Sequence, residues 1–199
     1  IRSSRARGRG GPVMIWIAVG GASLFVFTFA TFLYARLRRD DDRIAAEAAS
    51  LERAGRLDDA IALWHTLRVL EPIEPRWIYA VASGHERAGR KKAAAAEYES
   101  IVTRGIESSS FPLWRARSAS AMISYDLGLF EKAFAAAAEA VIDNPGAAGA
   151  LCVLGRLYAS QQASNPAHLD TAIRFLERAA AADPNLPRVH RFLGLAYLD

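Results

Sequence analysis

The chain has 199 residues and a single cysteine, and its 25 basic and 21 acidic residues give a formal net charge of +4. A hydrophobic share of 52% excludes an intrinsically disordered chain. One cysteine excludes both a disulfide framework and a zinc module built from several cysteines. Because a sequence pI of about 9.5 is typical of nucleic-acid-binding proteins, the position of the excess charge decides between function classes.

The excess positive charge lies entirely at the N-terminal end of the chain. Residues 1–43 contain eight arginines and three aspartates, a net charge of +5, whereas the remaining residues carry a net charge of −1. A neutral body lacks the positive field on which binding to nucleic acid depends. We therefore expect no nucleic-acid partner.

An uncharged apolar run over residues 13–34 (VMIWIAVGGASLFVFTFATFLY) separates two arginine-rich flanks. As a helix, this run extends for about 33 Å, which matches a hydrocarbon core of roughly 30 Å. Trp16 and Tyr34 lie near its ends, where aromatic rings favour the membrane interface. The pattern predicts three segments, namely a basic arm over residues 1–12, a transmembrane helix over 13–35 and a charged juxtamembrane linker over 36–43.

A cleaved signal peptide is the alternative to an anchor. Its apolar core is usually only ~7–15 residues long, and no small-residue cleavage pattern closes this run. Arginine is the only charged residue type in the preceding arm, which favours a cytoplasmic arm and a periplasmic body. We expect a single-pass protein of a bacterial inner membrane. The opposite orientation stays open, because both flanks carry four arginines.

The rest of the chain contains an internal repeat. Four alanines recur at separations of 34, 39 and 39 residues, at positions Ala60, Ala94, Ala133 and Ala172. A glycine precedes three of them by five positions, and a proline follows three of them by twelve. Periods of this length indicate a helical repeat protein.

These residues resemble the tetratricopeptide repeat (TPR) family, whose 34-residue unit has a W-x2-L-G-x2-Y pattern, then A-x3-F and a proline. The resemblance implies an all-α, right-handed solenoid of helix-turn-helix repeats over residues 44–199. A small residue on each first helix, such as Ala82 or Gly155, is expected beside a large one on the second, such as Tyr98 or Leu176. Insertions around 104–112 and 160–169 extend two loops. The expected repeats cover residues 41–74, 75–108, 114–147 and 148–186, and a partial repeat over 187–199 predicts a longer protein.

The repeats lack the residue patterns of an enzyme active site. No glycine-rich phosphate loop, nucleophile elbow or pair of catalytic carboxylates occurs in the sequence. The four histidines and Cys152 have no partners at the spacing of a metal site. We therefore expect no enzymatic activity, no cofactor and no metal.

The TPR resemblance also implies a binding surface, because the family binds partners in a concave groove lined by positions 2, 5, 9 and 12 of each first helix. In this chain those positions supply arginines and apolar side chains, which suit an acidic or carboxylate-bearing peptide. A solvated charged face is the alternative. The predicted groove residues are Arg76, Tyr79, Ser83, Arg115, Met122, Tyr125, Arg156, Arg188 and Arg191. The Lys/Asn clamp of chaperone-type TPR domains is absent from the first repeat, where Ala45 and Ala49 occupy its positions.

Together these features predict a membrane-anchored TPR scaffold or adaptor that binds a protein or peptide partner and supports assembly of a complex at the membrane. The order of anchor and repeats looks like that of cytochrome c maturation subunits and of translocon-associated periplasmic factors. The alternative is the interaction module of a larger enzyme or of a secretion or cytochrome c maturation component.

Overall fold

The computed structural model describes residues 40–161 and 167–198. The chain divides into two compact units, Ile1–Ile44 and Ala45–Asp199. The predicted basic arm and transmembrane segment, residues 1–35, lie outside the described residues. Among the helices of the described ranges, none is long and apolar enough to cross a lipid bilayer.

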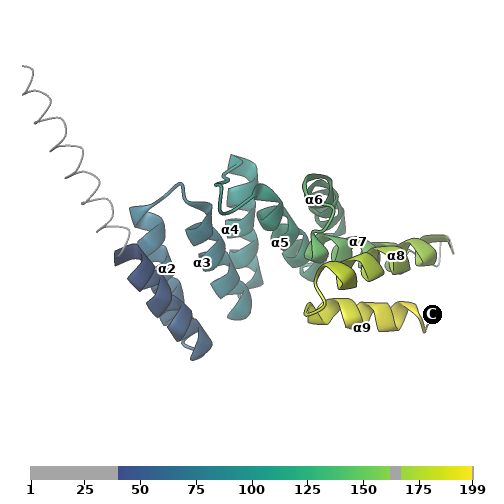
Figure 1. Ribbon diagram of the computed structural model, residues 1–199, viewed down its shortest axis with the longest axis horizontal. Coiled ribbons are helices and arrows are strands. Elements are labelled where there is room, and N and C mark those ends of the chain that lie inside the picture. The colour runs from purple at the N-terminus through teal and green to yellow at the C-terminus, as the bar shows by residue number, and fades with distance from the viewer. Residues whose placement is uncertain (1–39, 162–166, 199) are drawn as a thin grey trace, which may run out of the picture. The chain divides into compact units, whose positions relative to one another are not determined.

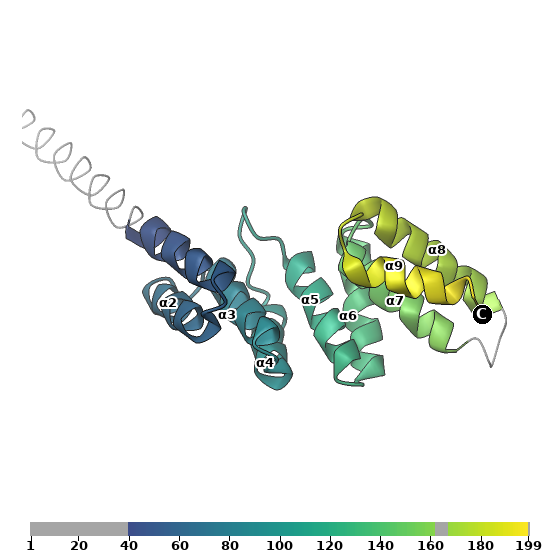
Figure 2. The ribbon, with the colours of Figure 1, turned by 90° about the horizontal axis from the view of Figure 1, so that it is seen from below.

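The described part of the chain is all-helical, with nine helices and no named strand. A first helix over residues 40–53 is followed by eight more, which pack in sequence order as antiparallel pairs (Figures 1 and 2). This succession makes residues 45–161 and 167–198 an α-solenoid. Their bounds are α2 (Leu57–Leu70), α3 (Pro75–Arg87), α4 (Lys91–Arg104), α5 (Leu113–Asp126), α6 (Phe130–Asp143), α7 (Ala148–Ser160), α8 (Ala167–Ala182) and α9 (Pro187–Ala196).

Glycine makes the tight turn within three of the helix pairs. Gly55, Gly89 and Gly128 have φ angles of 77°, 75° and 77°, in the left-handed region that L-residues with a side chain rarely adopt. After each glycine, the next backbone N–H donates to the carbonyl five residues earlier, over 2.9, 2.8 and 2.9 Å. This helix-ending geometry explains why a glycine precedes the repeat alanine by a constant five positions.

The predicted pairing of small and large side chains holds the helix pairs together. Gly155 on α7 lies so close to α8 that an added Cβ would be 2.7 Å from Cγ of Leu176. Ala82 on α3 and Tyr98 on α4 are both fully or almost fully buried in one apolar cluster. The sequence prediction is therefore confirmed in these two pairs.

The inserted connection between α4 and α5 is structured. Gly105 ends α4 with φ of 60°, and Ser108 and Phe111 then exchange two backbone hydrogen bonds of 3.1 and 3.0 Å. Phe111 is only 3% exposed and packs in an apolar cluster with Ile78, Ile101 and Ala116. The aromatic ring of the insertion thus packs in the core between α3 and α5. The other predicted insertion, 160–169, falls partly on residues outside the described ranges.

Candidate partner-binding groove

The predicted groove residues lie on the first helices of successive pairs and gather around two pockets. Tyr79, Ser83, Arg115 and Met122 line the first pocket, which has a volume of about 290 Å³. The second pocket has a volume of about 330 Å³, and its lining includes the predicted residues Tyr125, Arg156, Arg188 and Arg191. The two pockets, which we call the groove, share helix α5.

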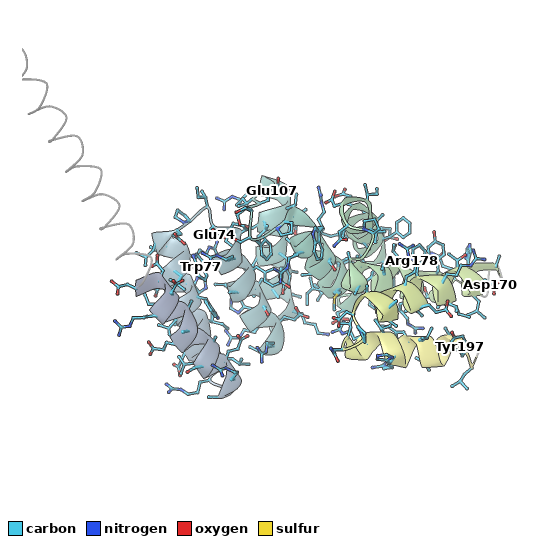
Figure 3. All side chains as sticks on the ribbon, viewed as in Figure 1. Glu74, Trp77, Glu107, Asp170, Arg178 and Tyr197 are labelled. Atoms are coloured by element: carbon cyan, nitrogen blue, oxygen red, sulfur yellow. The ribbon has the colours of Figure 1, made fainter. Side chains whose placement is uncertain are left out.

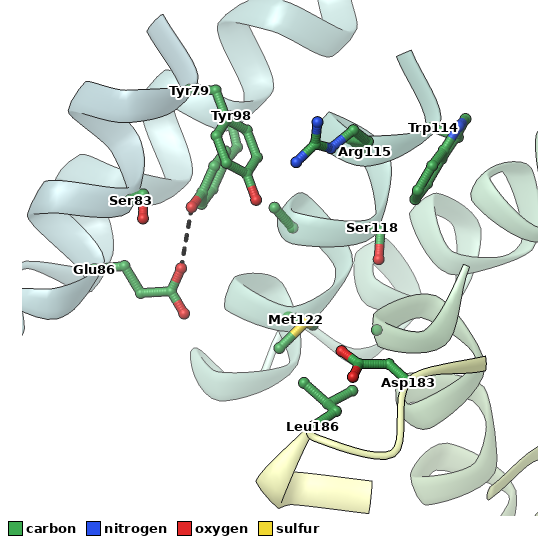
Figure 4. A pocket seen from close by; sticks show the side chains of 12 residues that line it. Tyr79, Ser83, Glu86, Tyr98, Trp114, Arg115, Ser118, Met122, Asp183 and Leu186 are labelled. Carbon is green, nitrogen blue, oxygen red and sulfur yellow. Dashed lines mark hydrogen bonds between the residues drawn. The ribbon is translucent and has the colours of Figure 1, made fainter. Parts of the chain in front are cut away.

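One wall of the first pocket is aromatic (Figure 4). The rings of Tyr79 and Tyr98 lie 5.2 Å apart at a tilt of 54°, and the Tyr98 hydroxyl donates a hydrogen bond of 3.1 Å to the Glu86 carboxylate. Burial is the main cause that raises the pKa of both tyrosines. The Arg115 guanidinium lowers the pKa of Tyr79 by less than burial raises it, and the nearby Glu86 carboxylate raises the pKa of both rings further. Both rings therefore stay neutral at physiological pH.

Charged side chains surround this apolar wall. Figure 4 shows Glu86 on α3 and Asp183, just after α8, on opposite sides of the first pocket. The Arg115 guanidinium lies over the rings of Phe111, at 5.1 Å, and Tyr79, at 6.0 Å. Cation–π contacts of this kind hold a guanidinium in place while leaving its N–H groups available. The pocket therefore offers both hydrogen-bond acceptors and a fixed donor.

Gly149 at the start of α7 lines the first pocket and lies close to α5. A Cβ at this position would lie 2.7 Å from both the Met122 sulfur and the Ser118 hydroxyl oxygen on α5. Glycine thus permits α5 and α7 to approach closely beneath the pocket, because any side chain would displace two of its lining residues.

A partly exposed ion pair lies in the lining of the second pocket. Asp126 accepts two hydrogen bonds of 2.8 Å from Arg188 and lies 3.7 Å from the Lys91 ammonium group. The Asp126 side chain is only 15% exposed. The hydrogen bonds to Asp126 raise the pKa of Arg188, and the Asp126 carboxylate compensates the arginine's charge.

The other two arginines of the second pocket stack on an aromatic ring. Arg156 donates a hydrogen bond of 3.1 Å to the Tyr125 hydroxyl oxygen and lies 5.3 Å above the Phe192 ring. Arg191 lies 5.7 Å from the centroid of the same ring. Among the described residues, no carboxylate lies within ion-pair distance of either guanidinium. The lining of the second pocket therefore has an excess of positive charge.

Arg76 lies apart from both pockets. Its guanidinium forms an ion pair of 3.2 Å with Glu74 and lies 4.4 Å above the Trp77 ring. Figure 3 labels Glu74 and Trp77 where α3 begins. Of the nine predicted groove residues, eight thus line the groove and Arg76 does not.

Several lining residues were not predicted from the sequence. Lys91 and Tyr98 come from α4, a second helix, and the TPR mapping considers first helices only. Asp183 and Leu186 come from the connection between α8 and α9. Within the described ranges, no group of three or more His, Cys, Asp or Glu side chains could hold a metal ion.

Comparison with known proteins identifies the fold. No family model and no curated protein matches the sequence. The structure is similar to that of TTC0263, a thermophilic TPR protein of Thermus thermophilus, with a TM-score of 0.60, 21% identity and coverage of 79% of this chain and 81% of that one.

Two further solved structures support the same assignment. MamA from Desulfovibrio magneticus has a TM-score of 0.60 at 16% identity, covering 79% of this chain and 84% of its own. YrrB, described as a TPR protein with an unusual peptide-binding site, has a TM-score of 0.55 at 17% identity. The match covers 78% of this chain and 75% of the YrrB chain. The described repeats therefore have the fold of TPR proteins.

Proposed function

We propose that the chain is a membrane-anchored scaffold that binds an extended segment of a protein partner in its groove and supports assembly of a complex at a bacterial inner membrane. The observation that carries this proposal is the composition of the first pocket. Side chains from α3, α4, α5 and the α8–α9 connection meet there, and α7 adds the backbone at Gly149. A site shared by so many elements suits a ligand that extends across several repeats.

The chemistry of the groove favours a peptide. The aromatic rings of Tyr79 and Trp114 offer apolar contact area, and Met122 adds an adaptable apolar side chain. The carboxylates of Glu86 and Asp183 can accept hydrogen bonds from backbone N–H groups of a peptide, and Arg115 can donate to its carbonyls. An extended segment presents all of these groups at once.

Site-specific photocrosslinking tests partner binding. A photoreactive phenylalanine replaces Ser83 or Leu186 in the first pocket, and in a matched control it replaces Ala135, which is exposed on α6. We expect both groove positions to capture the same polypeptide in intact cells, and the control position to capture none of it. Equal capture from Ala135 would contradict the groove model.

The proposed anchor rests on the sequence of residues 13–34 and their arginine flanks. Alkaline phosphatase, which is active only after export, is fused after Asp199 in the full chain and in a variant lacking residues 13–34. For the fusion to the full chain, we expect an active phosphatase and a fusion protein that stays in the membrane during alkaline extraction. We expect neither result for the variant that lacks residues 13–34. An inactive fusion of the full chain would reverse the proposed topology.

A further inference from the structure

The arginines of the second pocket fall into two classes that sequence alone does not distinguish. Arg188 is neutralised by two hydrogen bonds of 2.8 Å from its guanidinium to Asp126. Arg156 and Arg191 contact only neutral groups among the described residues, namely the Tyr125 hydroxyl and the Phe192 ring. Among the arginines of the second pocket, the positive charge available to a ligand is therefore on Arg156 and Arg191.

The contacts of Arg156 hold its side chain in place before any ligand binds. Its guanidinium has a hydrogen bond of 3.1 Å to the Tyr125 hydroxyl and the Phe192 ring at 5.3 Å, whereas the exposed Arg191 has the same ring at 5.7 Å. Preorganisation of this kind lowers the entropy cost of forming new hydrogen bonds. Lys91 adds a third positive charge, although Asp126 lies 3.7 Å from it.

We propose that the second pocket is a subsite for an acidic side chain of the bound partner, with Arg156 and Arg191 as its carboxylate contacts. A guanidinium donates paired N–H groups that match the two oxygens of a carboxylate. This inference rests on the proposed function, because it assigns the chemistry of a peptide that binds in the groove. Arg188 is a positioning residue, since it holds Asp126 and α9 without a free charge.

The fold also predicts where the acidic residue lies in the partner. Met122 in the first pocket and Asp126 in the second are four residues apart on α5, which corresponds to about 6 Å along the helix. Gly149 and Arg156 are seven residues apart on α7, or about 10 Å. An extended peptide advances about 3.3 Å per residue. The acidic side chain therefore lies two or three residues from the side chain that enters the first pocket.

A phage-displayed library of random peptides tests the subsite on the full chain in detergent. We expect peptides selected by the unmodified chain to carry Asp or Glu two or three positions from an apolar residue. The Arg156→Gln/Arg191→Gln variant is expected to select the apolar residue without the acidic one. Arg76→Gln, which removes an arginine outside both pockets, is the matched control and is expected to select the same peptides as the unmodified chain.

A synthetic peptide from this selection gives the quantitative test. Replacing its Glu by Gln, or its Asp by Asn, is expected to weaken binding to the unmodified chain about tenfold, and binding to the Arg156→Gln/Arg191→Gln variant less than twofold. That fold-change corresponds to about 1.4 kcal/mol, as for a partly exposed charged pair. Circular dichroism checks that the double variant is folded. If it is not, the single variant Arg191→Gln, at an exposed position, is used in its place.

Two outcomes separate the subsite from the proposed function. The subsite would be overturned, with peptide binding intact, if the selected peptides carried no acidic residue at a fixed position. The same conclusion would follow if replacing the acidic residue weakened binding to the double variant as much as binding to the unmodified chain. Failure of the unmodified chain to select any peptide would overturn peptide binding in the groove and the subsite with it.

Discussion

Arg188 and Asp126, which are 62 residues apart in sequence, join the start of α9 to the end of α5 through two hydrogen bonds of 2.8 Å. The pair therefore links two helices that belong to repeats separated by a complete helix pair. Asp126 is mostly buried and Arg188 only partly, and both residues line the second pocket. The pair therefore contributes to the lining of the groove as well as to the docking of α9.

The first prediction concerns this ion pair. Arg188→Gln should destabilise α9 by about 1 kcal/mol. A charged hydrogen-bonded pair contributes more to the free energy of unfolding than a surface ion pair does, but the contribution of this pair is reduced because it is partly exposed. Hydrogen exchange of the α9 amides is the suitable measurement, because repeat proteins open locally. Asp126→Asn and the double variant complete a double-mutant cycle. A coupling energy close to zero would show that the pair contributes nothing to the docking of α9.

The second prediction uses two glycines at equivalent positions of the repeat. Gly155→Ala should destabilise the chain by about 1–3 kcal/mol, because its Cβ would lie 2.7 Å from Cγ of Leu176 and 3.1 Å from the Ala172 carbonyl oxygen. Gly194→Ala is the matched control, since apart from its chain neighbours and the backbone of its own helix no atom of the described residues lies within 4 Å of its Cβ position. In α9 the higher helix propensity of alanine should raise stability by up to ~1 kcal/mol.

Urea unfolding monitored by circular dichroism compares these glycine variants with the unmodified chain. Equal effects of the two substitutions would mean that backbone flexibility, and not the close contact of α7 with α8, decides the choice of glycine.

The helical repeat could be predicted from the sequence because its determinants are local. The constant five positions between Gly55 and Ala60, and between Gly89 and Ala94, reflect one turn geometry that each repeat forms by itself. The positions of eight groove residues follow from the same local periodicity, because one face of every first helix points in the same direction.

The pairing of groove charges could not be predicted in the same way. Whether Arg188 contacts Asp126 depends on how far the solenoid turns between α5 and α9. The two residues are 62 positions apart, which is not a multiple of the repeat spacing of 34 or 39 residues. Arg76 occupies the same position of its helix as Arg115, yet Glu74 lies 3.2 Å from it and neutralises its charge. The availability of a charge is thus a property of the packed structure.

The third prediction concerns the inserted connection before α5. Phe111→Ala should destabilise the chain by about 3–5 kcal/mol, because an almost fully buried ring is replaced by a cavity. The substitution also removes the ring that lies 5.1 Å from the Arg115 guanidinium, so peptide binding in the first pocket should weaken. Urea unfolding and peptide titration measure the two effects.

Phe111→Leu separates the two roles of this ring. Leucine refills most of the cavity but offers no π-face to Arg115, so stability should largely return while peptide affinity stays low. Recovery of both properties with leucine would show that the ring acts on the first pocket through packing alone.

The fourth prediction concerns the reactivity of Cys152, which is 2% exposed on α7. Burial raises the pKa of its thiol to about 11, against a smaller lowering effect of Arg188. At pH 8 only about one native molecule in a thousand therefore carries the reactive thiolate. Modification by an aromatic disulfide reagent should be slow in buffer and fast in urea.

The pH dependence of this reaction reveals the state in which Cys152 is attacked. Because the buried sulfur is shielded, we expect modification to proceed through local opening, in which the thiol has its ordinary pKa of 9.0. The rate should then rise about tenfold per pH unit and level off near pH 9, and Arg188→Gln, which loosens α9, should accelerate it about fivefold. A rate that is still rising at pH 10, and is unaffected by Arg188→Gln, would instead indicate attack on the folded chain, where the raised pKa governs the thiolate population.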